Sequence, residues 1–92
     1  MTIDGRRRKA IRTIGQVSSL VDRARGLRAL ARVHNMTQTA KHLTVIANTL
    51  DGVRTHLVED HEYEPIAAAF VDTASKRLVD IADKIGRARN GR

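Results

Sequence analysis

Residues 36–59, MTQTAKHLTVIANTLDGVRTHLVE, decide the fold of this chain. Apolar residues recur through the stretch at steps of three and four, which places them on one face of a helix. They are Met36, Ala40, Leu43, Ala47, Leu50, Val53 and Leu57. Ile46 and Ala47 continue this face past Thr44 and Val45 without a helix-breaking residue. The pattern therefore favours one continuous helix, although the same letters also fit two helices with a turn at residues 44 and 45.

Helical spacing continues on both sides of this stretch. Before it, the apolar positions are Ile11, Ile14, Val17, Leu20, Val21, Ala24, Leu27 and Ala31. After it, they are Ala67, Phe70, Ala74, Leu78, Ile81, Ile85 and Ala88. Pro65 suits the first turn of a helix, where its missing N–H has no intrahelical partner. We predict an all-α fold, a three-helix bundle of residues 7–33, 36–59 and 65–89 in up-down-up order, with a helix-turn-helix as the alternative arrangement of the middle segment.

The length and composition allow one small domain. Ninety-two residues can build a single hydrophobic core, so residues 1–92 form one helical domain with a basic amino-terminal arm at about residues 1–9. The chain has no cysteine, which excludes disulfides and thiolate metal sites. No apolar run approaches the roughly 18 residues of a membrane span, and no apolar segment typical of a secretion signal follows the basic start. These features predict a cytoplasmic protein.

The net charge of +7 is concentrated in the first third of the chain. Residues 1–32 hold nine lysines and arginines against Asp4 and Asp22, whereas acidic and basic residues balance in residues 33–92. Such a cluster is typical of proteins that hold nucleic-acid phosphates. The sequence predicts phosphate contacts from Arg6, Arg7, Arg8, Lys9, Arg12, Arg25, Arg28 and Arg32. Only Tyr63 and Phe70 are aromatic, so base stacking is poorly provided for and duplex DNA is the preferred partner.

Part of the central stretch is similar to a known DNA-binding motif. TAKHLTV, residues 39–45, followed by Leu50, resembles the helix-turn-helix of phage Cro-type repressors. The resemblance places a small residue, Ala40, where two helices cross. It also implies that the apolar residues Leu43, Val45 and Leu50 pack between the two helices and hold them together. The similarity covers residues 37–57 and implies a DNA-binding domain.

A looser resemblance extends this similarity. Residues 29–43, ALARVHNMTQTAKHL, and residues 72–85, DTASKRLVDIADKI, resemble helices that flank the motif in the DNA-binding domains of LysR-type regulators. Departures include Thr44 at the turn position usually given to glycine, and Asp51 and Gly52 within the recognition helix. If the motif forms, the resemblance implies base contacts from Asn48, Thr49, Arg54 and Thr55.

A second class of function rests on four acidic residues between the last two helices. They are Glu59, Asp60, Glu62 and Glu64, and they are suited to dock the basic helix of a neighbouring copy or of a partner protein. The alternative function is therefore a helical interaction or assembly module that forms homo-oligomers or binds a protein partner. The sequence has no glycine-rich phosphate loop and no nucleophile with a base at a spacing that helices would bring together. We therefore predict no enzyme activity, no cofactor, no metal site and no small-molecule substrate.

Overall fold

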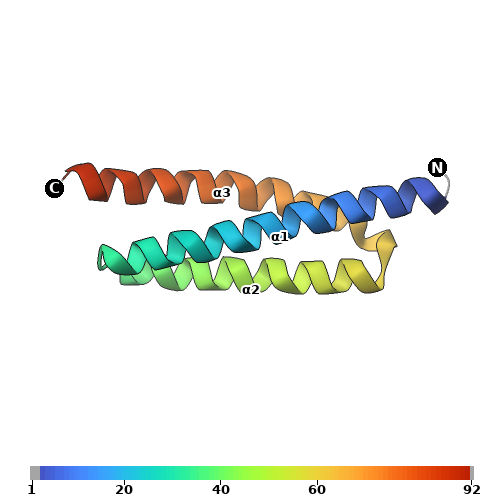
Figure 1. Cartoon of the computed structure of the whole chain (residues 1–92), viewed down its shortest axis with the longest axis horizontal. Coiled ribbons are helices and arrows are strands. Elements are labelled where there is room, and N and C mark those ends of the chain that lie inside the picture. Colours follow the sequence, from blue (N-terminus) through green and yellow to red (C-terminus); the bar gives the residue numbers. More distant parts are fainter. Residues whose placement is uncertain (1–2, 92) are drawn as a thin grey trace.

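The computed structural model describes residues 3–91, which form three α-helices and one short 3-10 helix (Figure 1). The elements are α1 (Ile3–Val33), α2 (Thr37–Glu59), η1 (His61–Tyr63) and α3 (Glu64–Gly91). They pack as an up-down-up three-helix bundle, so the predicted fold class is confirmed. The Cα atoms extend over 54 × 17 × 15 Å, and the start of α1 and the end of α3 lie at opposite ends of this rod (Figure 1). Within residues 3–91, none of the helices combines the length and apolarity needed to cross a membrane.

α2 is one unbroken helix, as the periodicity of residues 36–59 favours. Six of the seven predicted apolar positions are buried, and Met36, just before the helix, packs against the core. The helix-turn-helix alternative is therefore wrong, because no turn interrupts Thr44 and Val45. The Thr44 hydroxyl donates to the Ala40 carbonyl oxygen at 3.1 Å, one turn earlier in the same helix.

The connection between α1 and α2 is a tight turn closed by backbone hydrogen bonds. Asn35 adopts a φ of 58°, in the left-handed region that asparagine tolerates at the end of a helix. The Met36 N–H donates to the Ala31 carbonyl oxygen at 2.8 Å, and the Asn35 N–H donates to the Arg32 carbonyl oxygen at 3.0 Å. This pattern satisfies the last carbonyl groups of α1 and turns the chain so that α2 runs back along α1.

α1 differs from the prediction at its start and at one core position. It begins at Ile3 instead of residue 7, so the described part of the predicted basic arm is helical. Ile11, predicted to be apolar core, is 58% exposed, and Ala10 is buried in its place. Thr13 and Val17 are buried on the same face as Ala10, so the core face at the start of α1 is rotated by one position from the predicted one.

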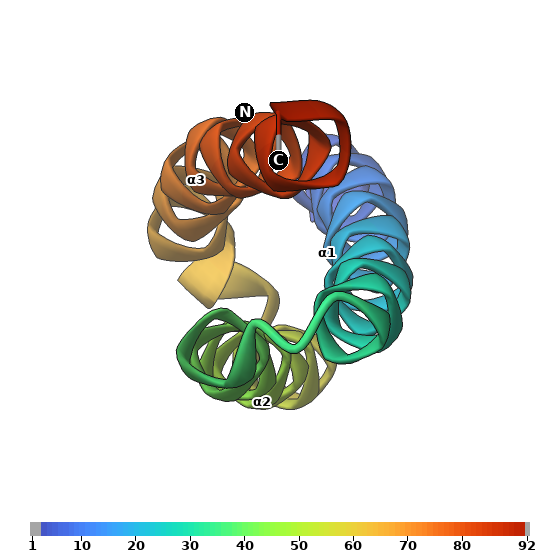
Figure 2. The ribbon, with the colours of Figure 1, turned by 90° about the vertical axis from the view of Figure 1, so that its left-hand side faces the viewer.

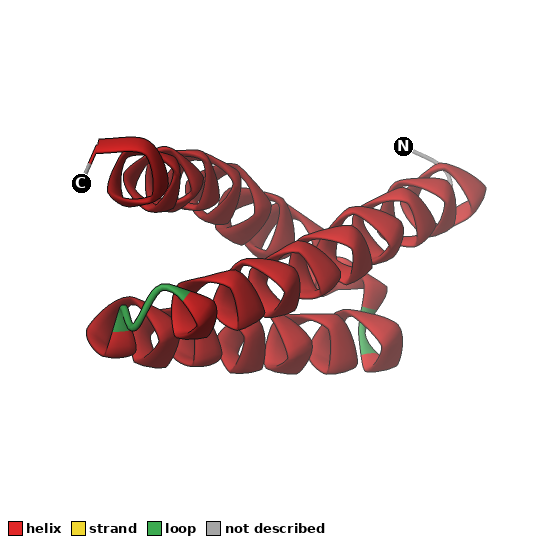
Figure 3. Cartoon of the chain, turned by 60° about the vertical axis from the view of Figure 1, so that its left-hand side comes forward, coloured by secondary structure: helices red, strands yellow, loops and turns green. Residues whose placement is uncertain are grey.

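α3 packs more extensively on α1 than on α2. Seen obliquely, it diverges from the α1–α2 pair toward its carboxyl end (Figure 3). Leu78, Ile81 and Ile85 are buried, as predicted. Phe70 was predicted to lie on the core face but remains 39% exposed, because it faces the weakly packed side between α2 and α3.

Two glycines of α1 offer a direct test of its helical character. Gly15 and Gly26 lie inside the helix, and a Cβ added at either would meet no atom within 4 Å. We expect Gly15→Ala and Gly26→Ala each to raise the free energy of unfolding by about 0.5–1 kcal/mol. The shift of the urea denaturation midpoint to higher urea concentration measures this change. The exposed Ala29→Gly should lower it by a similar amount. A destabilising effect of both alanine substitutions would contradict a continuous helix.

Candidate nucleic-acid interface

The basic side chains of α1 lie outside the core because the apolar residues occupy only one face of the helix. Of the eight predicted phosphate contacts, seven are solvent-exposed: Arg6, Arg7, Arg8, Lys9, Arg12, Arg25 and Arg32. The eighth, Arg28, is half-buried, and its Nη1 donates to Thr44 Oγ1 of α2 at 3.5 Å. α1 therefore presents positive charge at its start, along its length and at its end.

Few of these charges are neutralised within the chain. The structure shows four ion pairs among the described residues: Arg6–Glu62 at 3.4 Å, Arg54–Asp51 at 2.5 Å, Lys76–Asp72 at 3.1 Å and Arg87–Asp83 at 3.0 Å. Only the first involves a basic residue of α1. The other pairs lie within α2 or α3 at helical spacing. Most of the positive charge of the first third is thus unpaired within the described residues.

One group of basic residues gathers at the turn between α1 and α2. Arg28 and Arg32 come from the last turns of α1, and Lys41 comes from the first turns of α2. Arg32 and Lys41 line one shallow groove together with Thr44, the residue that Arg28 contacts. We call Arg28, Arg32 and Lys41 the turn cluster. The sequence-based prediction missed Lys41, because only the antiparallel packing of α2 on α1 brings it to the arginines.

The opposite end of α1 carries mixed charge. The acidic residues predicted to dock a partner lie against the start of the helix, where Glu62 pairs with Arg6 and Glu64 accepts a hydrogen bond from Thr13 Oγ1 at 3.2 Å. Asp60 caps η1 by accepting from the Glu62 N–H at 3.0 Å. Glu59 is the one member of this acidic set without such a contact in the described structure. Intramolecular pairing lowers the positive potential at this end relative to the turn cluster.

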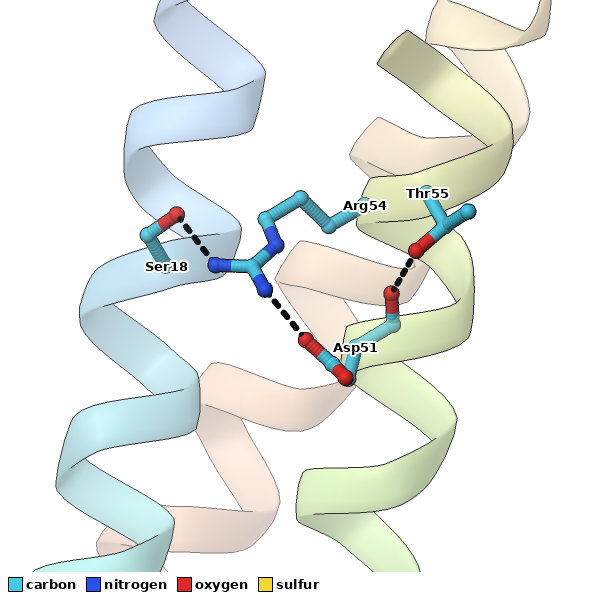
Figure 4. A network of polar contacts seen from close by, with 4 residues as sticks. All are labelled: Ser18, Asp51, Arg54 and Thr55. Atoms are coloured by element: carbon cyan, nitrogen blue, oxygen red, sulfur yellow. Dashed lines mark hydrogen bonds and ion pairs between the residues drawn. The ribbon is translucent and has the colours of Figure 1, made fainter. Parts of the chain in front are cut away.

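The residues that the helix-turn-helix resemblance assigned to base contacts do not form a common surface. Arg54 points toward α1, where it contacts Ser18 Oγ at 3.4 Å and pairs with Asp51 (Figure 4). Thr55 donates to the Asp51 carbonyl oxygen at 3.1 Å. Thr49 lines a groove between α2 and α3, and Asn48 is exposed. Because residues 37–59 form one continuous helix, the two-helix arrangement on which these base contacts depend does not form.

Neither aromatic residue lies on α1. Tyr63 of η1 stacks on the ring of His56, with the ring centroids 3.9 Å apart. Phe70 lines the groove between α2 and α3. The basic helix therefore has no aromatic platform for unpaired bases.

A further pocket at the start of α1 is lined by polar side chains and Pro65; the polar residues are Arg6, Lys9, His61, Glu62 and Glu64. Within the described residues, no three histidine, aspartate or glutamate side chains are grouped so that they could hold a metal ion. No protein-family model, curated protein or solved structure matches this chain. The basic surface of α1 is thus the feature from which a function can be argued.

Proposed function

We propose that this chain binds duplex DNA without catalysis, mainly through phosphate contacts from α1 and the turn cluster. The observation that carries this proposal is the unpaired positive charge of α1. The sequence of the helix contains nine lysines and arginines but only two acidic residues, Asp4 and Asp22, and one of the nine basic residues forms an ion pair in the described structure. Arginine and lysine near phosphates release condensed counterions, which favours binding.

The length of α1 fits a duplex partner. Its 31 residues span about 46 Å, and a duplex of that length carries roughly 27 phosphate charges. A straight helix cannot follow a curved groove over this distance, so we expect about four basic side chains to reach phosphates at once. The turn cluster should contribute some of these contacts. At the other end of α1, Arg6 is already paired with Glu62, and the exposed Arg7, Arg8, Lys9 and Arg12 should supply the rest. The scarcity of aromatic residues near α1 favours a duplex over a single strand.

A salt series with a fluorescent duplex tests this proposal. We expect the logarithm of the association constant to fall linearly with the logarithm of salt concentration, with a slope of roughly −3 to −5 for about four phosphate contacts. Arg25→Ala combined with Arg32→Ala should make the slope less steep by about 2 and weaken binding to unrelated sequences alike. Anisotropy titrations between low and physiological salt measure both effects.

Two basic residues of α3 provide a matched control. Lys76 and Arg87 are exposed like Arg25 and Arg32, but each is paired with an aspartate one turn away. Lys76→Ala combined with Arg87→Ala removes the same formal charge and should change the slope much less. If the two double variants change the salt slope equally, DNA binding depends on the net charge of the chain and not on the position of the basic residues in α1. No binding at low salt would rule out the DNA-binding function.

A further inference from the structure

Residues of α2 and α3 line an apolar groove. The end-on view shows the three helices arranged around one centre, with α1 on the side away from the space between α2 and α3 (Figure 2). Its walls include Val45, which is 61% exposed, and Phe70. The other lining residues are His42, Ile46, Thr49, Leu50, Thr73, Ala74 and Arg77. Ile66 is exposed one turn before Phe70 and extends the apolar surface along α3. Arg77 is the only lysine, arginine, aspartate or glutamate that lines the groove in the described structure.

The two ends of the groove carry different groups. At one end, Arg77 Nη1 lies 3.4 Å from His42 Nε2, and Lys84 follows Arg77 on the same face two turns later. Beyond the other end, outside the residues that line the groove, His56 stacks on Tyr63, and Glu59 follows His56 three residues later. Asp60 comes directly after Glu59, where α2 ends. The groove is thus apolar in the middle and basic at one end, and the acidic residues Glu59 and Asp60 lie beyond its other end, where α2 ends.

This arrangement is complementary to itself when a second copy is turned through 180°. His42 and His56 each lie seven residues from Thr49, and Arg77 and Tyr63 each lie seven residues from Phe70. A two-fold axis through Thr49 and Phe70 therefore brings the basic end of one copy over the acidic end of the other. Arg77 then meets the His56–Tyr63 stack with Glu59 beside it. The Phe70 side chains of the two copies meet at the axis, and Val45 of each copy lies about one turn from it.

We propose that this chain forms an antiparallel homodimer through the groove between α2 and α3. This inference goes beyond the proposed DNA binding and does not depend on it. α2 is about 34 Å long and two adjacent helices are about 20 Å wide, so this face offers roughly 700 Å² per copy. A stable interface takes about 600–1,000 Å² from each partner. Surfaces that include α1 are unsuitable for pairing two copies, because they would bring unpaired arginines of like charge together.

The dimer leaves α1 of both copies on outward faces. Each basic helix therefore stays accessible, and the assembly has two basic surfaces on opposite sides. The interface residues and the proposed phosphate-binding residues do not overlap, so dimer formation and DNA binding can be measured separately.

Sedimentation equilibrium of nucleic-acid-free protein tests the dimer directly. We expect a mass of twice 10.2 kDa at tens of micromolar protein. Val45→Glu places a charge in the centre of the interface on an exposed position of α2, and we expect it to raise the dimer dissociation constant at least tenfold. Val79→Glu is the matched control, because Val79 is 54% exposed but does not line the groove. Far-UV circular dichroism checks that both variants keep their helical content.

Charge reversal tests the antiparallel arrangement. Arg77→Glu should raise the dimer dissociation constant about tenfold, because it places a carboxylate beside Glu59 of the second copy. Adding Glu59→Arg to the same chain should restore most of the affinity by exchanging the two charges. A mass of 10.2 kDa at every concentration up to millimolar would overturn the dimer and leave the groove to another partner. A dimer that tolerates Val45→Glu but dissociates with Val79→Glu would overturn this interface.

Discussion

Replacement of Asn48 by proline should lower the free energy of unfolding by about 3 kcal/mol or more. Asn48 is exposed in the middle of α2, so the loss arises from the backbone. Proline removes the N–H that bonds to the carbonyl oxygen of Thr44 in a continuous helix, and its ring clashes with that oxygen. A domain of this size has a total stability near the lower end of about 5–15 kcal/mol, so the variant should be close to unfolding at room temperature.

The same substitution separates the two arrangements of residues 36–59. In a helix-turn-helix, Asn48 would lie in the first turn of the second helix, where proline is well tolerated. Asn48→Ala is the control for loss of the side chain and should be neutral or slightly stabilising, since alanine favours a helix. Urea denaturation followed by far-UV circular dichroism measures both variants. Equal midpoints for the proline and alanine variants would argue for a break near Thr44.

Truncation of Leu43 to alanine should cost about 2–5 kcal/mol of stability. Leu43 is fully buried in α2, and residues seven and fourteen positions later, Leu50 and Leu57, are also buried. Removing three side-chain carbons from such a site loses their burial and leaves a cavity that the surrounding helices fill only in part. Thermal and urea unfolding should therefore shift strongly even though the helical residues are otherwise unchanged.

Leu30→Ala provides the matched control for this prediction. Leu30 lies near the end of α1 with 36% of its surface exposed, so the same truncation removes fewer contacts. We expect it to cost about 1 kcal/mol or less. Similar losses for the two variants would mean that Leu43 is not packed as the structure shows. A loss limited to Leu43 would confirm that the stripe of α2 is the centre of the core.

The charge pattern and the packing give this molecule two distinct surfaces on opposite sides. α1 and the turn cluster present unpaired positive charge, while α2 and α3 present an apolar groove that is basic at one end. Two dimerised copies would hold basic helices on opposite sides of one assembly. Bringing two duplex segments together is then an expected property of the dimer, and Val45→Glu should abolish it while each chain still binds DNA.

Much of the fold follows from the sequence alone. The spacing of the apolar residues in 36–59 predicts α2 because helical periodicity is a property of neighbouring residues and needs no tertiary information. The sequence also predicts the start of the third helix at Pro65, which lies in the first turn of α3. The concentration of positive charge in the first third can likewise be read from the sequence. The ion pairs Asp72–Lys76 and Asp83–Arg87 also follow from spacing within one helix.

Tertiary structure decided the features that depend on how one helix lies against another. The periodicity of one helix does not fix how it is rotated or shifted against its neighbours. The burial of Ala10 instead of Ile11, and the exposure of Phe70, are therefore seen only in the assembled bundle. The same offset brings Lys41 to Arg32 and pairs Arg6 with Glu62. Helical periodicity and composition are enough to predict three helices and a basic first third. Packing determined which charges remain unpaired and where the apolar groove lies, because both depend on contacts between residues far apart in the chain.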